Sequence, residues 1–239
     1  IDPEKIISVA VTPCTAKKAE IAREELCDAG KLLNIEEMRD NDYVITTKEL
    51  VQWCQEEGLD LDKITPSKFD SVLGEGTGAG MIFGNTGGVM EAALRTVYRV
   101  LEGKEAPADF YQLRPVRGLS NRKEAEVTIA GKKLRVCILY GTAAAEEFLA
   151  EDMNGYHFVE VMTCPGGCIS GAGQPDCGSV PVSDVVRKKR IQSLYQADEQ
   201  AERRNSMDNP EIGTIYHEFF KEPLSMLSEK LLHTTYKRK

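Results

Sequence analysis

In the first half of the chain, the spacing of apolar residues alternates between that of a strand and that of a helix. Residues 6–11 form a short, β-branched run typical of a buried strand, and Pro13 ends it because proline cannot donate to a sheet ladder. A helical period follows over about residues 16–29, with Gly30 as the predicted stop. Residues 44–46 read as a second strand, and Thr46 with Glu49 predicts a capping box for a helix ending near Glu57.

The second half alternates in the same way. The pattern predicts a helix over residues 89–101, a hairpin of strands 126–129 and 134–140, a helix over 143–153 and a strand over 157–162. After Pro181 the composition becomes charged and polar, with helices expected over 183–201, 211–220 and 224–232.

These elements predict an α/β fold, with a layered sheet of parallel strands flanked by helices and a helical C-terminal extension. We expect an α/β domain over residues 1–180 and the extension over residues 181–239.

Composition narrows the class of protein. The chain has 239 residues, of which 41% are hydrophobic, enough for a substantial core. A formal net charge of −8 argues against a nucleic-acid binder, which needs a basic face. No apolar stretch approaches the roughly 18 residues of a membrane helix, and no signal peptide opens the chain. We therefore expect a cytoplasmic protein without a membrane span, with the periplasm as the alternative.

The cysteines are the main candidates for chemistry. Seven cysteines fit poorly with a closed disulfide framework and favour reduced thiols, metal ligation or catalysis. Cys164 and Cys168 flank Pro165 and two glycines, which predicts an irregular loop whose backbone can approach an inorganic group closely. Iron–sulfur clusters need thiolates on such loops, while a buried or disulfide-linked pair is an equally weighted alternative.

A second cysteine, Cys14, follows the first strand as Cys164 follows the last. Because sites in open α/β sheets lie beyond the carboxyl ends of strands, we expect these two segments in one site. Cys27, Cys54 and Cys137 fall in helix or strand patterns, where a small buried side chain is expected. Cys177 lies close in sequence to the proposed cluster loop.

The remaining patterns leave alternatives open. The glycine-rich residues 74–88 match no nucleotide motif, and either a pocket wall or a packing segment fits them. Lys17, near a helix start, is either a solvated charge or a donor to an anionic ligand. The basic residues 187–190 are expected on a solvated helix face, with a docking patch for an acidic electron-transfer partner as the alternative.

Three segments, in order, resemble the catalytic domain of iron-iron (FeFe) hydrogenases. Residues 12–20, Thr-Pro-Cys-Thr-Ala-Lys-Lys-Ala-Glu, are similar to the second cluster motif of that family. Residues 158–168, Phe-Val-Glu-Val-Met-Thr-Cys-Pro-Gly-Gly-Cys, continuing through Gln174-Pro175, resemble the third motif. Residues 78–93 resemble the glycine-rich segment between them, so the resemblance spans nearly the whole chain.

The resemblance implies an iron hydrogenase-like lobe that holds an H-cluster. This cofactor is a 4Fe–4S cubane joined by one cysteine to a two-iron subsite with CO, cyanide and a bridging dithiolate. By motif position, Cys14 and Cys164 would bind the cubane and Cys168 would bridge to the two-iron unit.

The resemblance also implies roles beside the cluster and electron-transfer partners. Lys17 would donate to a cyanide ligand, Met162 would pack beside the subsite, and Phe83 would line its pocket. The family activity is reversible oxidation of dihydrogen and reduction of protons, with ferredoxin or another electron-transfer protein or subunit as partner.

The chain departs from the family pattern in three places. Thr12 replaces the usual methionine, Ala172 replaces a glycine, and the first motif, Thr-Ser-Cys-Cys-Pro, is missing. We therefore expect a C-terminal fragment that needs an upstream lobe, and we expect the isolated chain to hold no complete H-cluster and to evolve no hydrogen. The alternatives are a non-catalytic, hydrogenase-like protein of cytosolic iron–sulfur cluster assembly, and a cluster-free thiol domain.

Overall fold

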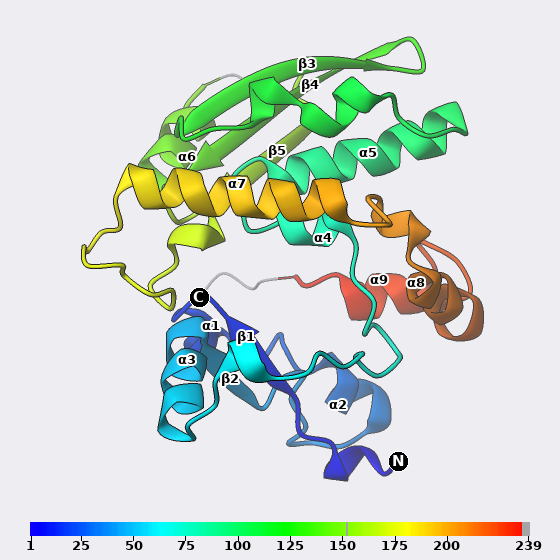
Figure 1. The fold of residues 1–239 in the computed structure, drawn as a ribbon. Coiled ribbons are helices and arrows are strands. Elements are labelled where there is room, and N and C mark those ends of the chain that lie inside the picture. The colour runs from blue at the N-terminus through cyan, green and yellow to red at the C-terminus, as the bar shows by residue number, and fades with distance from the viewer. Residues whose placement is uncertain (152, 236–239) are drawn as a thin grey trace. The chain divides into compact units, whose positions relative to one another are not determined.

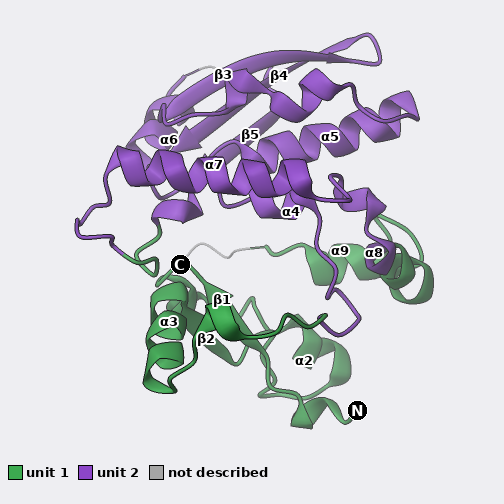
Figure 2. Ribbon diagram, in the orientation of Figure 1, with its two compact units in different colours: residues 1–68, 171–175, 213–239 green, residues 69–170, 176–212 purple. Residues whose placement is uncertain are grey.

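The computed structural model describes residues 1–151 and 153–235, and these form two compact units (Figures 1 and 2). Unit 1 contains Ile1–Lys68, Gly171–Pro175 and Gly213–Lys239, and unit 2 contains Phe69–Ser170 and Asp176–Ile212. The units are therefore assembled from segments that are distant in the chain.

Unit 1 is built on a small parallel sheet. Strand β1 (Val9–Thr12) pairs with β2 (Tyr43–Thr46), with Val9 opposite Tyr43. The helices of unit 1 are α1 (Lys17–Glu20), α2 (Asp28–Leu33), α3 (Thr47–Glu56) and α9 (Met226–Leu232).

The capping box at the start of α3 is confirmed. The Glu49 N–H donates to Thr46 Oγ1 at 3.2 Å, and the Thr46 N–H donates to Glu49 Oε2 at 2.8 Å. Two groups that the first helical turn would leave without partners are thereby satisfied.

The continuous helix expected over residues 16–29 is wrong. Only α1 and α2 form, and Gly30 lies inside α2 rather than ending a helix. The start of α2 is fixed by Asp40, whose carboxylate accepts the N–H groups of Asp28 and Ala29 at 3.2 and 2.9 Å. A Cβ at Gly30 would lie 2.6 Å from the Met38 carbonyl oxygen, so close packing explains this glycine.

Unit 2 contains a mixed sheet with the order β3-β4-β5. Strands β3 (Arg122–Ile129) and β4 (Lys132–Tyr140) are antiparallel, and β5 (Phe158–Met162) runs parallel to β4. The predicted hairpin is confirmed, with a tighter turn than expected. Ala130 and Gly131, with φ of 50° and 73°, form the turn, as a two-residue hairpin loop requires.

Strand β4 is buried on both faces. Val136 and Ile138 pack with Met90 and Leu94 of α5 (Gly88–Glu102). The alternate residues of β4, Cys137 and Leu139, pack with Ala144 and Phe148 of α6 (Thr142–Leu149). This alternation explains the uninterrupted apolar run of this strand.

Unit 2 also contains helices on either side of its sheet segment in the chain. They are α4 (Gly78–Ile82), α7 (Asp184–Gln200) and the start of α8 (Pro210–Ile215), which is followed by a π-helical segment over Tyr216–Phe220. Helix α4 packs against α5 and α7, and α5 packs against β3 and β5. The expected α/β class is confirmed, and its strands are divided between two small sheets flanked by helices.

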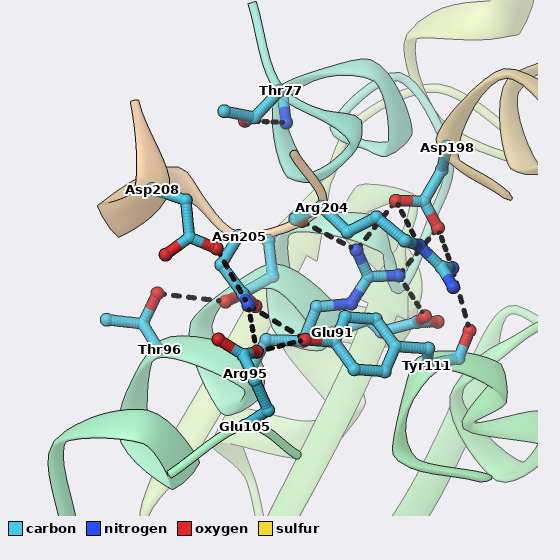
Figure 3. Close-up of polar contacts among 12 residues, drawn as sticks. Thr77, Glu91, Arg95, Thr96, Glu105, Tyr111, Asp198, Arg204, Asn205 and Asp208 are labelled. Atoms are coloured by element: carbon cyan, nitrogen blue, oxygen red, sulfur yellow. Dashed lines mark hydrogen bonds and ion pairs between the residues drawn. The ribbon is translucent and has the colours of Figure 1, made fainter. Parts of the chain in front are cut away.

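Buried charges join α5 to α7 within unit 2 (Figure 3). Arg95, Glu91 and Asp198 are all inaccessible to solvent, and Arg95 donates to both carboxylates. Arg117 donates to Glu91 at 2.7 Å, and Arg204 pairs with Asp198. Each buried carboxylate is thus held by two guanidinium groups, which offsets the cost of removing it from water.

Candidate metal centre

The Cys164–Cys168 segment is a tight turn directly after β5. The Gly167 N–H donates to the Cys164 carbonyl oxygen at 2.9 Å, and Gly166 and Gly167 have φ of 81° and 97°. Cys164 is half-buried and Cys168 is exposed. The two glycines therefore provide a left-handed backbone that brings both cysteines to one irregular loop, as the sequence predicts.

This turn lies on the glycine-rich segment that precedes α5. The Thr86 N–H donates to the Gly166 carbonyl oxygen at 3.0 Å, and the Ile169 N–H donates to the Gly84 carbonyl oxygen at 3.1 Å. A Cβ added to Gly167 would lie only 2.7 Å from both Gly84 O and Thr86 N. Residues 84–86 thus support the cysteine turn by direct backbone contact, so this part of the glycine-rich passage is a close-packed segment.

Two buried charged side chains hold that supporting segment. Glu160 of β5 accepts the N–H groups of Gly87 and Met90 at 2.6 and 2.8 Å and so caps the start of α5. Lys123 donates to the carbonyl oxygen of Thr86 at 3.1 Å and to that of Gly118 at 3.1 Å.

Burial changes the acidity of both groups. It raises the pKa of Glu160 above its usual value, despite the two backbone donors, and it lowers the pKa of Lys123 to about 8. The sequence assigned no role to either residue. One feature of the sequence could have indicated Glu160, because it is a charged residue at the centre of an apolar strand. No comparable feature indicates Lys123, because it lies in a strand in which polar and apolar residues alternate.

Met162 lies directly against the cysteine turn. Its Sδ would be 2.9 Å from a Cβ at Gly167, so the thioether occupies the space that this glycine leaves. Phe83 follows α4 and is 46% exposed, one residue before the carbonyl of Gly84 that supports the turn. Unit 2 therefore brings Met162, Cys164 and Cys168 together and places Phe83 on the chain beside their support.

Cys14 and Lys17 belong to unit 1. The Cys14 N–H donates to Thr12 Oγ1 at 3.3 Å after the end of β1. Lys17 begins α1, has a half-exposed side chain and forms an ion pair with Glu20. Gly173, five residues after Cys168, is part of the same unit, and its N–H donates to the Pro13 carbonyl oxygen at 2.9 Å.

Cys14 and Cys164 do not follow strands of one sheet, contrary to expectation. Each cysteine does follow the carboxyl end of a strand, but β1 and β5 lie in separate sheets and separate units. The rule about strand ends applies within one sheet, so it relates neither cysteine to the other.

The other cysteines fit their expected environments only in part. Cys137 is fully buried in β4, whereas Cys27 and Cys54 are half-buried and Cys177 is exposed. None of the seven, all within the described residues, forms a disulfide.

The donor chemistry of the cysteine turn fits an iron–sulfur group. It presents the thiols of Cys164 and Cys168 on one tight glycine turn, with the Met162 thioether packed against Gly167. Over residues 1–151 and 153–235, no three Cys, His, Asp or Glu side chains form a ready metal-binding group. A 4Fe–4S cubane normally takes four protein ligands.

Comparison with known proteins defines the class as iron hydrogenase. The family model "Iron only hydrogenase large subunit, C-terminal domain" matches residues 1–172, and the model "Iron hydrogenase small subunit" matches residues 184–239. The chain belongs to the family of iron-only hydrogenase large subunits, of which it carries sequence from the C-terminal domain.

The chain is similar to relatives of two kinds, a hydrogenase and a cluster-assembly factor. Iron hydrogenase 1 of Clostridium pasteurianum is 37% identical over 242 residues, which cover 100% of this chain and 41% of that protein. The cytosolic Fe-S cluster assembly factor narfl of Xenopus tropicalis is 29% identical, over 99% of this chain and 48% of that protein.

A variant of FeFe-hydrogenase HydA1 from Chlamydomonas reinhardtii superposes with a TM-score of 0.76 at 33% identity. The match covers 99% of this chain and 64% of that one. The chain thus spans less than half the length of these two curated relatives.

Among the described residues, no helix is both long and apolar enough to cross a membrane.

Proposed function

We propose that this chain is the part of an FeFe hydrogenase that carries the second and third cluster motifs. Cys14 and Cys164 would bind a 4Fe–4S cubane, and Cys168 would link it to the two-iron subsite of an H-cluster. When bound, this group supplies the redox chemistry for reversible oxidation of dihydrogen. The fourth protein ligand would come from the first motif, in an upstream lobe.

The single observation that carries the proposal is the construction of the cysteine turn. Its Gly166 and Ile169 peptides are hydrogen-bonded to residues 84–86, and that segment is held by buried Glu160 and Lys123. A loop fixed in this way presents sulfur ligands without further ordering, which is the arrangement that a bound cluster requires.

The proposed roles of the neighbouring side chains follow from their chemistry. Lys17 would hold its proton on Nζ and donate it in a hydrogen bond to an anionic ligand. Met162 and Phe83 would cover the subsite with apolar surface and exclude water. Ferredoxin or another electron-transfer protein or subunit is the proposed electron partner.

Anaerobic reconstitution tests the ligand assignment. The chain is incubated with iron and sulfide, and bound iron is measured together with the visible and electron paramagnetic resonance spectra. Cys164→Ser and Cys168→Ser should each reduce bound iron several-fold, whereas Cys54→Ser on α3 serves as a matched control and should not. Measurable iron in wild type that is equal in all three variants would refute the assignment.

A second measurement separates the enzyme from the cluster-assembly class, which the lower identity to narfl, 29% against 37%, supports less well. We expect the full-length protein to turn over hydrogen and its Lys17→Ala variant to lose most of that activity. We expect the isolated chain to show no turnover. Cluster binding without any turnover by the full-length protein would support the assembly class.

A further inference from the structure

The basic residues 187–190 of α7 do not form a uniformly solvated face. Lys188 and Lys189 are exposed, but Arg187 and Arg190 are partly buried. Residues three apart lie on the same side of a helix, so the two arginines face one neighbour together. The expected solvated face is therefore confirmed only for the two lysines.

That neighbour is the chain immediately after Cys168. Arg190 Nη1 donates to the Ile169 carbonyl oxygen at 2.6 Å, and Arg187 Nε donates to Ser170 Oγ at 3.2 Å. Arg187 is itself oriented by Asp184, whose carboxylate accepts its Nη1 at 2.6 Å.

Ile169 is consequently held at both of its backbone polar groups. Its N–H donates to the Gly84 carbonyl oxygen, and its carbonyl oxygen accepts from Arg190. Its side chain is also buried. The residue that follows Cys168 therefore has little freedom, and the position of the Cys168 thiol depends on it.

The same contacts bring positive charge to the turn. Arg190 Nη2 also lies 3.5 Å from Cys177 Sγ, and a guanidinium remains charged at any pH that the protein tolerates. Iron–sulfur clusters with thiolate ligands are anionic, and adding an electron makes them more so. A nearby fixed positive charge therefore favours the reduced state and raises the reduction potential.

We propose that Arg190, aided by Arg187, is a positioning residue for Cys168 and a charge that raises the reduction potential of the cluster bound there. The proposed effect of Arg190 on the reduction potential rests on the proposed function, because it requires Cys168 to be a cluster ligand. The positioning of the loop does not, because the contacts exist in the chain itself.

The test compares Arg190→Gln with Lys189→Gln, which removes the same charge from an exposed neighbour on the same helix. Arg190→Lys separates charge from geometry, since lysine keeps the charge but loses the planar donor pair. Circular dichroism verifies that each variant is folded. Three properties are measured: amide hydrogen exchange at Ile169 and Ser170 without iron, bound iron after reconstitution, and the midpoint potential from a redox titration.

We expect Arg190→Gln to exchange the Ile169 and Ser170 amides at least several-fold faster than wild type, to bind less iron and to titrate at a more negative potential. Arg190→Lys should recover the potential more fully than the iron content. Lys189→Gln should match wild type in all three properties.

Two negative results have different meanings. If Cys168→Ser binds as much iron as wild type but Arg190→Gln still accelerates exchange at Ile169, the proposed ligand role of Cys168 fails and the positioning role stands. If Arg190→Gln matches Lys189→Gln in exchange, iron content and potential, the inference is overturned while the proposed function is unaffected.

Discussion

The guanidinium of Arg95 in α5 donates two hydrogen bonds of 2.8 Å to the carboxylate of Asp198 in α7, 103 residues further along the chain (Figure 3). Both side chains are fully buried. The Arg95 guanidinium also lies 4.8 Å from the centre of the Tyr111 ring, which adds a cation–π contact. This pair fixes α7, the helix that carries Arg187 and Arg190, against α5.

Replacing Asp198 by Asn should destabilise the chain by about 3–5 kcal/mol, because buried Arg95 would lose one of its two carboxylate partners and keep only Glu91. Urea denaturation followed by circular dichroism measures the change. The Lys133→Gln variant removes one partner of the exposed pair with Glu126 and should leave the midpoint unchanged. Equal midpoints for the Asp198→Asn variant and wild type would contradict a structural role for the buried pair.

Because the Asp198 carboxylate is paired with two guanidinium groups, we expect the protein to lose stability at low pH. Burial alone would raise the pKa of Asp198, but hydrogen bonds from Arg95 and Arg204 outweigh it and lower the pKa below 3.8. Because the folded pKa is lowered, the stabilisation is complete above about pH 4 and is lost as the pH falls through the folded value. Over the pH range below about 4, the free energy of unfolding, measured by urea denaturation, should change less in the Asp198→Asn variant than in wild type.

Gly167→Ala should disrupt the cysteine turn. The left-handed backbone at this position costs a non-glycine residue about 1–2 kcal/mol, and the new Cβ would also contact Gly84, Thr86 and Met162. We expect loss of stability together with loss of iron binding after reconstitution. Gly155→Ala, at φ of 89° in open space, isolates the backbone cost and should bind iron as wild type does.

Glu160→Ala should cost about 1–3 kcal/mol, because two buried N–H groups at the start of α5 would lose their acceptor. Glu160→Gln keeps one oxygen and should cost less. Since the folded pKa of Glu160 is raised, the wild-type protein should lose stability relative to Glu160→Gln as the pH rises from 4.5 through that pKa. Urea denaturation of both variants across this range measures the difference, and parallel pH profiles would argue against the raised pKa.

Because Lys123 is buried, we expect the protein to become more stable as the pH rises above about 8. Its pKa is lowered by burial from 10.5 to about 8, so between these values the unfolded chain binds a proton that the folded chain has released. The free energy of unfolding should therefore rise with pH, by about 3 kcal/mol over this interval at about 1.4 kcal/mol per pKa unit. Lys123→Met lacks the titrating group, so its profile subtracted from that of wild type should show the rise. A constant difference between pH 8 and 10.5 would contradict the prediction.

Local patterns predicted the elements that depend on neighbours in sequence. Thr46 and Glu49 form their capping box, the Ala130-Gly131 turn joins the predicted hairpin, and residues 184–200 form one of the predicted C-terminal helices. In each case the partners lie within a few residues, so the sequence itself contains the interaction. The cysteine turn was likewise predictable, because Pro165 disfavours a helical Cys164 and the two glycines permit the left-handed backbone that the turn adopts.

The sequence did not predict what depends on distant partners. The start of α2 is set by Asp40, and the division of the strands between two sheets separates Cys14 from the unit that holds Cys164. No local sequence pattern distinguishes Arg190 from Lys189. Arg190 nevertheless donates a hydrogen bond to the loop after Cys168, whereas Lys189 is exposed to solvent.

The sequence by itself thus determined the family, the cysteine motifs and most of the secondary structure, because these depend on residue type and short-range spacing. Only the tertiary structure decided which charged side chains support the cysteine turn. Glu160, Lys123 and Arg190 acquire that role from backbone groups 21 to 73 residues away, and such contacts exist only after the chain has folded.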